Sequence, residues 1–115
     1  NAMTLAIAMI ETREALDALD EILTTPGIDG VFVGPADLSI TLSGGSIVDP
    51  HCAEVDAALS RVLERAAALG KFAGLYCLNG ASAKAALARG FALCSASDDL
   101  TLLRAAARLE LAAAR

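Results

Sequence analysis

The sequence has 115 residues and a mass of 11.7 kDa, which is the size of one domain. Hydrophobic residues make up 56% of it and charged residues 20%, and this composition excludes an intrinsically disordered chain. The formal net charge of −5 argues against nucleic-acid binding, because no basic surface is left for a phosphate backbone. No stretch approaches roughly 18 uncharged apolar residues, so we expect no transmembrane helix and no membrane partner.

The N-terminus and the cysteines indicate a cytoplasmic protein. The N-terminus lacks the basic region and the long apolar core of a secretion signal. Asn1-Ala2 resembles a tag remnant in front of an initiator Met3, so we expect the domain to span residues 3–115. Three cysteines are widely spaced and form no CxxC pair: Cys52, Cys77 and Cys94. This pattern is typical of reduced, mostly buried thiols.

The first half of the chain predicts two strands around one helix. Residues 5–10 are a short apolar run, as expected for a strand buried on both faces. Apolar residues then recur at helical spacing between Thr12, which can cap a helix, and Pro26-Gly27, which ends it. Residues 28–33 predict the second strand, which Gly34-Pro35 breaks.

The second half continues the alternation. Residues 36–50 read as a loop, and Asp49-Pro50 predicts the start of a helix that extends to Gly70. A third strand over 72–78, a helix over 81–89 and a fourth strand over 91–96 follow, and Ser97 caps a last helix. The pattern is four βα units, and strands separated by helices run parallel because each crossover returns the chain to the same end.

Two carboxylates follow neighbouring strands of this α/β arrangement. In parallel α/β folds, functional sites lie at the C-terminal ends of the strands, and Glu11 follows the first strand while Asp37 follows the second. Because adjacent strands lie roughly 4.8 Å apart, the two side chains can converge on one Mg²⁺ or Mn²⁺. The alternatives stay open: Glu11 is also a first-turn charge favoured by the helix dipole, and Asp37 a turn or cap residue.

Other polar residues have ordinary structural explanations. Asp98 and Asp99 suit the start of a helix. His51 has no paired His or Cys at ligand spacing, which favours a surface histidine, and no histidine is matched to the cysteines for a nucleophilic role. The sequence contains no phosphate-binding fingerprint. A flavodoxin-like sheet with an unrelated ligand is therefore disfavoured.

Two motifs resemble the HpcH/HpaI aldolase family. They are AMIET at residues 8–12 and GIDGVFVGPADLS at residues 27–39. Weaker matches at residues 70–74, 90–91 and 97–98 extend the similarity over nearly the whole chain. The family comprises metal-dependent class II aldolases of 2-oxo acids, related more distantly to citrate lyase β chains.

The resemblance implies a role for several residues. Glu11 and Asp37 match the two metal ligands of the family, and the backbone amides of Ala36 and Asp37 match the donors to the substrate carboxylate. The metal, Mg²⁺ or Mn²⁺, is chelated by a 2-oxo acid such as pyruvate and acts as a Lewis acid that stabilises its enolate. The implied reaction is cleavage of 4-hydroxy-2-oxo acids to pyruvate and an aldehyde.

The resemblance also implies that part of the machinery lies elsewhere. Family members are (β/α)₈ barrels, and the four βα units here match the C-terminal half of such a TIM barrel. The catalytic arginine and the His–Asp base pair of the family match no position of this chain, and His51 lies in the wrong element to replace them. We therefore expect no catalytic residue, a weak or vestigial metal site, and a chain that is incomplete or inactive alone. The alternative is a non-catalytic half-barrel that acts by oligomerisation or partner binding.

A half-barrel predicts association. Four strands cannot close alone, so the inner face, with side chains such as Ile10 or Phe32, would lie open beside unpaired strand edges. We expect a homodimer or larger oligomer, or a complementary half-barrel chain. Two copies could pair edge to edge, with exchange of the last helix as a variant.

Overall fold

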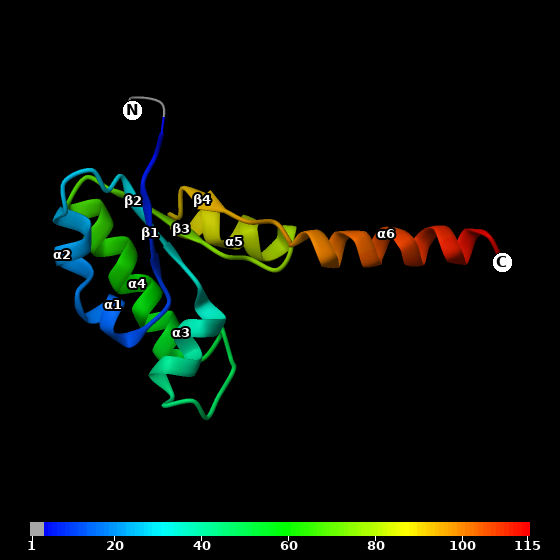
Figure 1. Cartoon of the computed structure of the whole chain (residues 1–115), viewed down its shortest axis with the longest axis horizontal. Coiled ribbons are helices and arrows are strands. Elements are labelled where there is room, and N and C mark those ends of the chain that lie inside the picture. Colours follow the sequence, from blue (N-terminus) through cyan, green and yellow to red (C-terminus); the bar gives the residue numbers. More distant parts are fainter. Residues whose placement is uncertain (1–3) are drawn as a thin grey trace.

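The strands form a single parallel sheet in a computed structural model that describes residues 4–115. Asn1-Ala2 and Met3 lie outside the described residues. The sheet has the order β1-β2-β3-β4, and every neighbouring pair is parallel (Figure 1). The strands are β1 (Ile7–Ile10), β2 (Gly30–Val33), β3 (Phe72–Leu75) and β4 (Leu93–Cys94). The predicted order of four βα units is confirmed.

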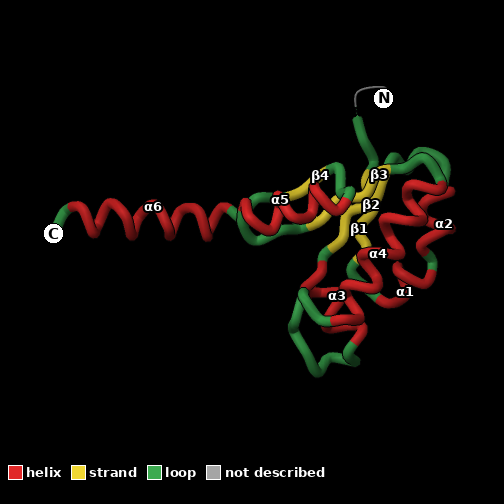
Figure 2. Tube along the Cα trace, turned by 180° about the vertical axis from the view of Figure 1, so that it is seen from behind, coloured by secondary structure: helices red, strands yellow, loops and turns green. Residues whose placement is uncertain are grey.

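Six helices connect and follow the strands in residues 4–115. They are α1 (Arg13–Asp17), α2 (Leu19–Thr24), α3 (Pro35–Leu42), α4 (Ala53–Ala68), α5 (Gly80–Arg89) and α6 (Asp99–Ala113). Helices α1, α2 and α4 cover one side of the sheet, and α6 leaves the body of the molecule along its longest direction (Figures 1 and 2). No helix among the described residues has the length and hydropathy to cross a membrane.

The segment after β2 differs most from the sequence prediction. Residues 36–50 do not form a continuous loop, because α3 begins at Pro35 with Gly34 as its N-cap. Proline is well suited to a first helical turn, where its missing N–H leaves no bond unmade. The predicted helix start at Asp49-Pro50 is also wrong: α4 begins at Ala53, and the Asp49 carboxylate instead accepts a hydrogen bond from the His51 amide at 2.9 Å.

Other boundaries shift by smaller amounts. The predicted helix after β1 is divided at Ala18 into α1 and α2. The third and fourth strands are shorter than predicted, and α6 is capped by Asp98, whose carboxylate accepts from the Thr101 amide, and not by Ser97. Helix α5 begins with a capping box between Asn79 and Ser82, which satisfies two backbone donors that the helix itself cannot pair.

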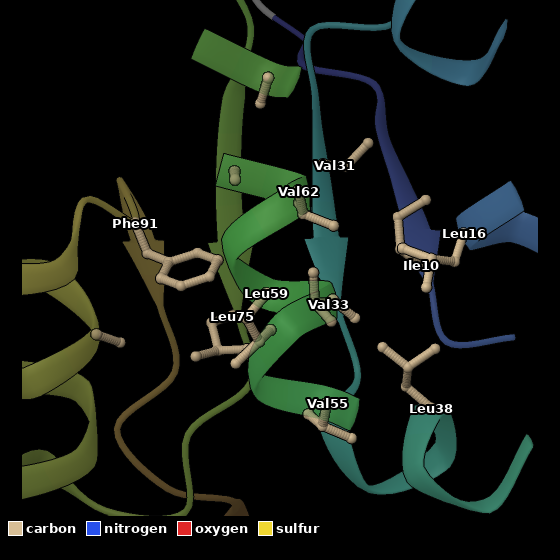
Figure 3. Packing of buried hydrophobic residues seen from close by; sticks show 14 of the residues in the cluster. Ile10, Leu16, Val31, Val33, Leu38, Val55, Leu59, Val62, Leu75 and Phe91 are labelled. Atoms are coloured by element: carbon tan, nitrogen blue, oxygen red, sulfur yellow. The ribbon is translucent and has the colours of Figure 1, made fainter. Parts of the chain in front are cut away.

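The hydrophobic core lies between the sheet and α4. Ile10, Val31 and Val33 point from the strands toward the helices and are fully buried. Figure 3 shows α4 laying Val55, Leu59 and Val62 across this face, and α2 adds two more buried leucines. Because side chains alternate along a strand, burial of these residues fixes which side chains face the other way.

The opposite face of the sheet is open in this chain. Met9 is 49% exposed and Leu93 43% exposed, and Phe32 is half-buried. The expectation that Ile10 lies on the open face is wrong, because Ile10 pairs with Val33 and is buried with it under the helices. Burial of β1 on both faces is likewise wrong for this chain, since its inner side has no covering layer.

Two aromatic rings on the open face lie against glycines of neighbouring strands. A Cβ at Gly74 would stand 2.5 Å from the Phe32 ring, and one at Gly30 would stand 2.6 Å from the Phe72 carbonyl oxygen and 2.8 Å from its ring. These residues are register partners, Phe32 with Gly74 and Gly30 with Phe72. Both glycines are therefore required by close packing, which links β2 to β3.

Every residue of helix α6 is exposed. None of its residues is buried, and the exposed side chains include five leucines: Leu100, Leu102, Leu103, Leu109 and Leu111. Contiguous exposed apolar surface of this kind is a mark of an interaction site.

Candidate active site

The strand register brings three residues into one row at the C-terminal edge of the sheet. Ile10 pairs with Val33, and Val33 pairs with Leu75. Two further bonds continue the ladder by one residue: the Gly34 amide donates to the Ile10 carbonyl at 3.2 Å, and the Tyr76 amide donates to the Val33 carbonyl at 3.0 Å. The next residues along, Glu11, Gly34 and Tyr76, therefore lie side by side.

Gly34 allows the two carboxylates of the predicted pair to approach each other. A Cβ built on Gly34 would lie 3.2 Å from Glu11 Oε2 and 3.7 Å from Asp37 Oδ2. Both carboxylates thus flank the same small volume, and Gly34 is the residue that leaves it free. Glu11 is half-buried and Asp37 is exposed, so solvent can reach both carboxylates.

The first turn of α3 adds backbone N–H donors beside the two carboxylates. Asp37 belongs to that turn, and the Leu38 amide is bonded to the Gly34 carbonyl at 3.0 Å. The amides of Ala36 and Asp37 precede this bond, at positions where a helix offers its N–H groups no internal acceptor. Such amides, at the positive end of the helix dipole, suit a carboxylate or another anion.

Tyr76 is a neighbour of the site that the sequence prediction did not single out. Its hydroxyl donates to Asp98 Oδ2 at 3.5 Å, which links the end of β3 to the start of α6. Partial burial, followed by the nearby Asp98 charge, raises the pKa of Tyr76. Hydrogen bonds from the amide and hydroxyl of Thr101 hold the pKa of Asp98 below its usual value. Only the pairing of β2 with β3, which no local pattern reveals, could have pointed to Tyr76.

A cavity of about 320 Å³ opens between α4 and α5 and adjoins the site, because Ala36 and Tyr76 are among its lining residues together with His51 and Cys77. Neither Glu11 nor Asp37 lines it. Asp98 is the N-cap of α6, where Ser97 was predicted.

The two carboxylates suit a cation for which water or substrate supplies most of the ligands. No group of three or more His, Cys, Asp or Glu side chains gathers around one point anywhere in residues 4–115. Two carboxylates are the protein ligands that Mg²⁺ typically uses, with waters and substrate oxygens completing its octahedron. The residues present are therefore compatible with Mg²⁺ or Mn²⁺ at low affinity.

Comparisons with known proteins assign the chain to a family. The sequence profile of the HpcH/HpaI aldolase/citrate lyase family matches residues 1–106. A hydroxypyruvate/pyruvate aldolase of Rhizorhabdus wittichii is 51% identical over 109 residues, which cover 95% of this chain and 43% of that protein. A 4-hydroxy-2-oxo-heptane-1,7-dioate aldolase of Salmonella paratyphi B is 42% identical over 97 residues, covering 84% and 36%.

Solved structures agree with this assignment. An HpcH/HpaI aldolase/citrate lyase family protein from Burkholderia cenocepacia superposes with a TM-score of 0.88 at 32% identity, over 99% of this chain and 44% of that one. The citrate lyase β subunit from M. tuberculosis, complexed with oxaloacetate and magnesium, has a TM-score of 0.67 at 28% identity, over 84% and 48%.

This chain belongs to the HpcH/HpaI aldolase/citrate lyase family. Its sheet and helices are part of a TIM-barrel-type fold. The chain spans less than half the length of the relatives that it matches.

The environment of Tyr76 predicts a measurable titration. Because the chain has one tyrosine and no tryptophan, the tyrosinate absorbance band reports this residue alone. We expect its midpoint to lie above the ordinary value of about 10, since burial and the Asp98 charge both oppose ionisation. Asp98→Asn should lower the midpoint, whereas Asp17→Asn, in the distant α1, should not. Equal midpoints in Asp98→Asn and the unmodified chain would contradict the contact.

Proposed function

We propose that this chain contributes the metal and substrate-carboxylate subsites of a divalent-metal aldolase acting on 2-oxo acids. The observation that carries the proposal is the approach of Glu11 and Asp37 to one volume beside Gly34. Family membership and the names of the aldolase relatives support it. The activity would belong to the whole barrel, because this chain spans less than half of its relatives.

Each residue of the site has a distinct part in this proposal. Glu11 and Asp37 would hold Mg²⁺ or Mn²⁺, and the Ala36 and Asp37 amides would orient the carboxylate of pyruvate or of a 4-hydroxy-2-oxo acid. The bound metal would supply Lewis-acid stabilisation of developing enolate charge. Gly34 would keep the space between the carboxylates free, and Tyr76 would border it from β3.

Proton transfer needs groups that this half does not provide. The sole histidine, His51, is exposed and lines the cavity between α4 and α5, to which neither Glu11 nor Asp37 contributes. The complementary four βα units would bring the base and a cation for the enolate, and would also cover the open face of the sheet.

The metal site is tested by Mn²⁺ titration, followed through paramagnetic relaxation of water protons. We expect weak binding that falls by roughly tenfold or more in Glu11→Gln and in Asp37→Asn, since changes outside the ligand shell alone commonly cost 10–100-fold. Gly34→Ala should also weaken binding, because its Cβ would crowd Glu11 while leaving both carboxylates in the chain.

Glu14→Gln is the matched control for this titration. Glu14 is an exposed carboxylate in the first turn of α1 and lies in the same segment as Glu11. It should bind Mn²⁺ as the unmodified chain does. Binding that is unchanged in both Glu11→Gln and Asp37→Asn would exclude the assignment.

Catalysis by the isolated chain should be very weak. Each lost group that stabilises transition-state charge commonly costs ~10²–10³-fold, and a half-barrel lacks several. Pyruvate release from a 4-hydroxy-2-oxo acid, coupled to lactate dehydrogenase, measures the rate. Robust turnover by the purified chain, abolished in Asp37→Ala, would show that the missing half is dispensable.

The open surfaces support a self-associating or partner-bound state. The inner sheet face exposes Met9 and Leu93, the sheet edges at β1 and β4 pair with no other strand among residues 4–115, and α6 has no buried residue. A homo-oligomer, or pairing with a complementary half-barrel chain, would cover the inner face and both edges. Exchange of α6 between copies would cover its leucines in the same step.

Association is measured by light scattering at micromolar concentration. We expect a mass of two chains or more. Leu103→Glu should reduce that mass, because it places a charge on the apolar surface of α6, while Arg104→Glu, the adjacent and already polar position, should change it less. A monomer that binds no hydrophobic dye would contradict the proposed association.

A further inference from the structure

Ser39, on α3, is the only buried polar side chain among residues 4–115, with an exposure of 1%. A buried hydroxyl costs free energy unless it is hydrogen-bonded, and this hydroxyl has two partners. It donates to the Ala36 carbonyl at 2.6 Å and accepts from the Asp49 amide at 3.0 Å. The carbonyl can only accept and the amide can only donate, so the direction of both bonds is fixed.

A second hydroxyl on the same helix shows what is unusual about Ser39. Thr41 donates to the Leu38 carbonyl, three residues before it, at 3.2 Å, which is a common local bond for Ser and Thr. Thr41 is half-buried, and its hydroxyl bonds to no other group among the described residues. The Ser39 bond is shorter and is joined to a second bond that reaches ten residues along the chain. It therefore does more than satisfy a hydroxyl within its own helix.

The carbonyl that Ser39 holds belongs to the same peptide group as a candidate substrate donor. The Ala36 carbonyl and the Asp37 amide are opposite ends of one planar trans unit, so a bond that fixes the carbonyl also fixes the direction of the N–H. The Asp37 amide lies in the first turn of α3, where the helix itself has no acceptor for it. A hydrogen bond accepted by the carbonyl also polarises the peptide and strengthens its N–H as a donor.

The segment between α3 and α4 is fastened to α3, which gives the Asp49 amide a fixed place. Ser43, four residues after Ser39, accepts from the Ile47 amide at 3.0 Å and donates to the Ile47 carbonyl at 3.2 Å. Farther along, the Asp49 carboxylate accepts from the His51 amide at 2.9 Å. Two serines of one helix thus hold this segment, and only Ser39 links it to the first turn of α3.

We propose that Ser39 is a positioning residue for the substrate carboxylate. This role rests on the proposed function, in which the Asp37 amide orients the carboxylate of a 2-oxo acid. The Asp49 amide holds the Ser39 hydroxyl in place. The hydroxyl holds the peptide group between Ala36 and Asp37, which presents its N–H beside the candidate metal site. Ser39 acts through this peptide and is itself a ligand of neither metal nor substrate.

The first test observes the peptide group by NMR in the labelled chain without ligand. The ¹⁵N signal of Asp37 and the carbonyl ¹³C signal of Ala36 both respond to a hydrogen bond at that carbonyl, because the two nuclei share one peptide. We expect both signals to move in Ser39→Ala, which removes the hydroxyl, and in Ser39→Cys, which keeps its size but is a weak donor. Thr41→Ala is the matched control: it removes a local bond from the same helix and should leave both signals in place.

The second test separates carboxylate binding from metal binding. Mn²⁺ binding is followed through relaxation of water protons, and pyruvate binding through relaxation of its methyl protons by bound Mn²⁺. Ser39→Ala and Ser39→Cys should weaken pyruvate binding by roughly two- to tenfold, which is the contribution of one ordinary hydrogen bond. Mn²⁺ affinity should not change, because the Glu11 and Asp37 carboxylates remain. Thr41→Ala should change neither affinity.

The outcomes distinguish the role of Ser39 from the proposed function. Unmoved Asp37 and Ala36 signals in both Ser39 variants, or pyruvate affinities equal to that of Thr41→Ala, would overturn the role. A parallel loss of Mn²⁺ and pyruvate affinity would also overturn it, because Ser39 would then support α3 as a whole. Failure of the unmodified chain to bind pyruvate with Mn²⁺ would instead overturn the proposed function, and the two NMR signals would still show whether Ser39 orients the peptide.

Discussion

The register of the parallel strands is the constraint on which the candidate site depends. Core packing sets it: Ile10 and Val33 are buried together under the helices, so neither strand can slip by one residue without exposing its apolar side chains. The residues that follow are then aligned as a consequence. Glu11 comes to lie beside Gly34, and α3 starts there with Asp37 in its first turn.

The same packing explains why one half of a barrel can keep a defined shape while remaining incomplete. The helix side of the sheet is a closed core, and the phenylalanines over Gly30 and Gly74 tie β2 to β3 on the other side. The described residues provide no such cover for the inner face, the sheet edges or α6.

Local patterns were sufficient for much of the fold. Apolar runs gave the four strands, helical spacing gave most of the connecting helices, and alternation of the two gave parallel pairing. They failed where one residue has two local meanings. Pro35 can end a strand and can also start a helix, so local pattern predicts a loop where α3 forms. Asp49-Pro50 has the form of a helix start, but Asp49 caps a turn there.

The sequence by itself determined the order of the elements, because that order depends on local patterns of residue types, and it predicted Glu11 and Asp37 as a pair because each follows a predicted strand. The tertiary structure alone decided that Ile10 faces the helices, that Gly34 leaves room between Glu11 and Asp37, and that Tyr76 lies beside Gly34 at the same edge. Those relations join strands many residues apart. They follow from burial and register, which are properties of the packed sheet and not of any one segment.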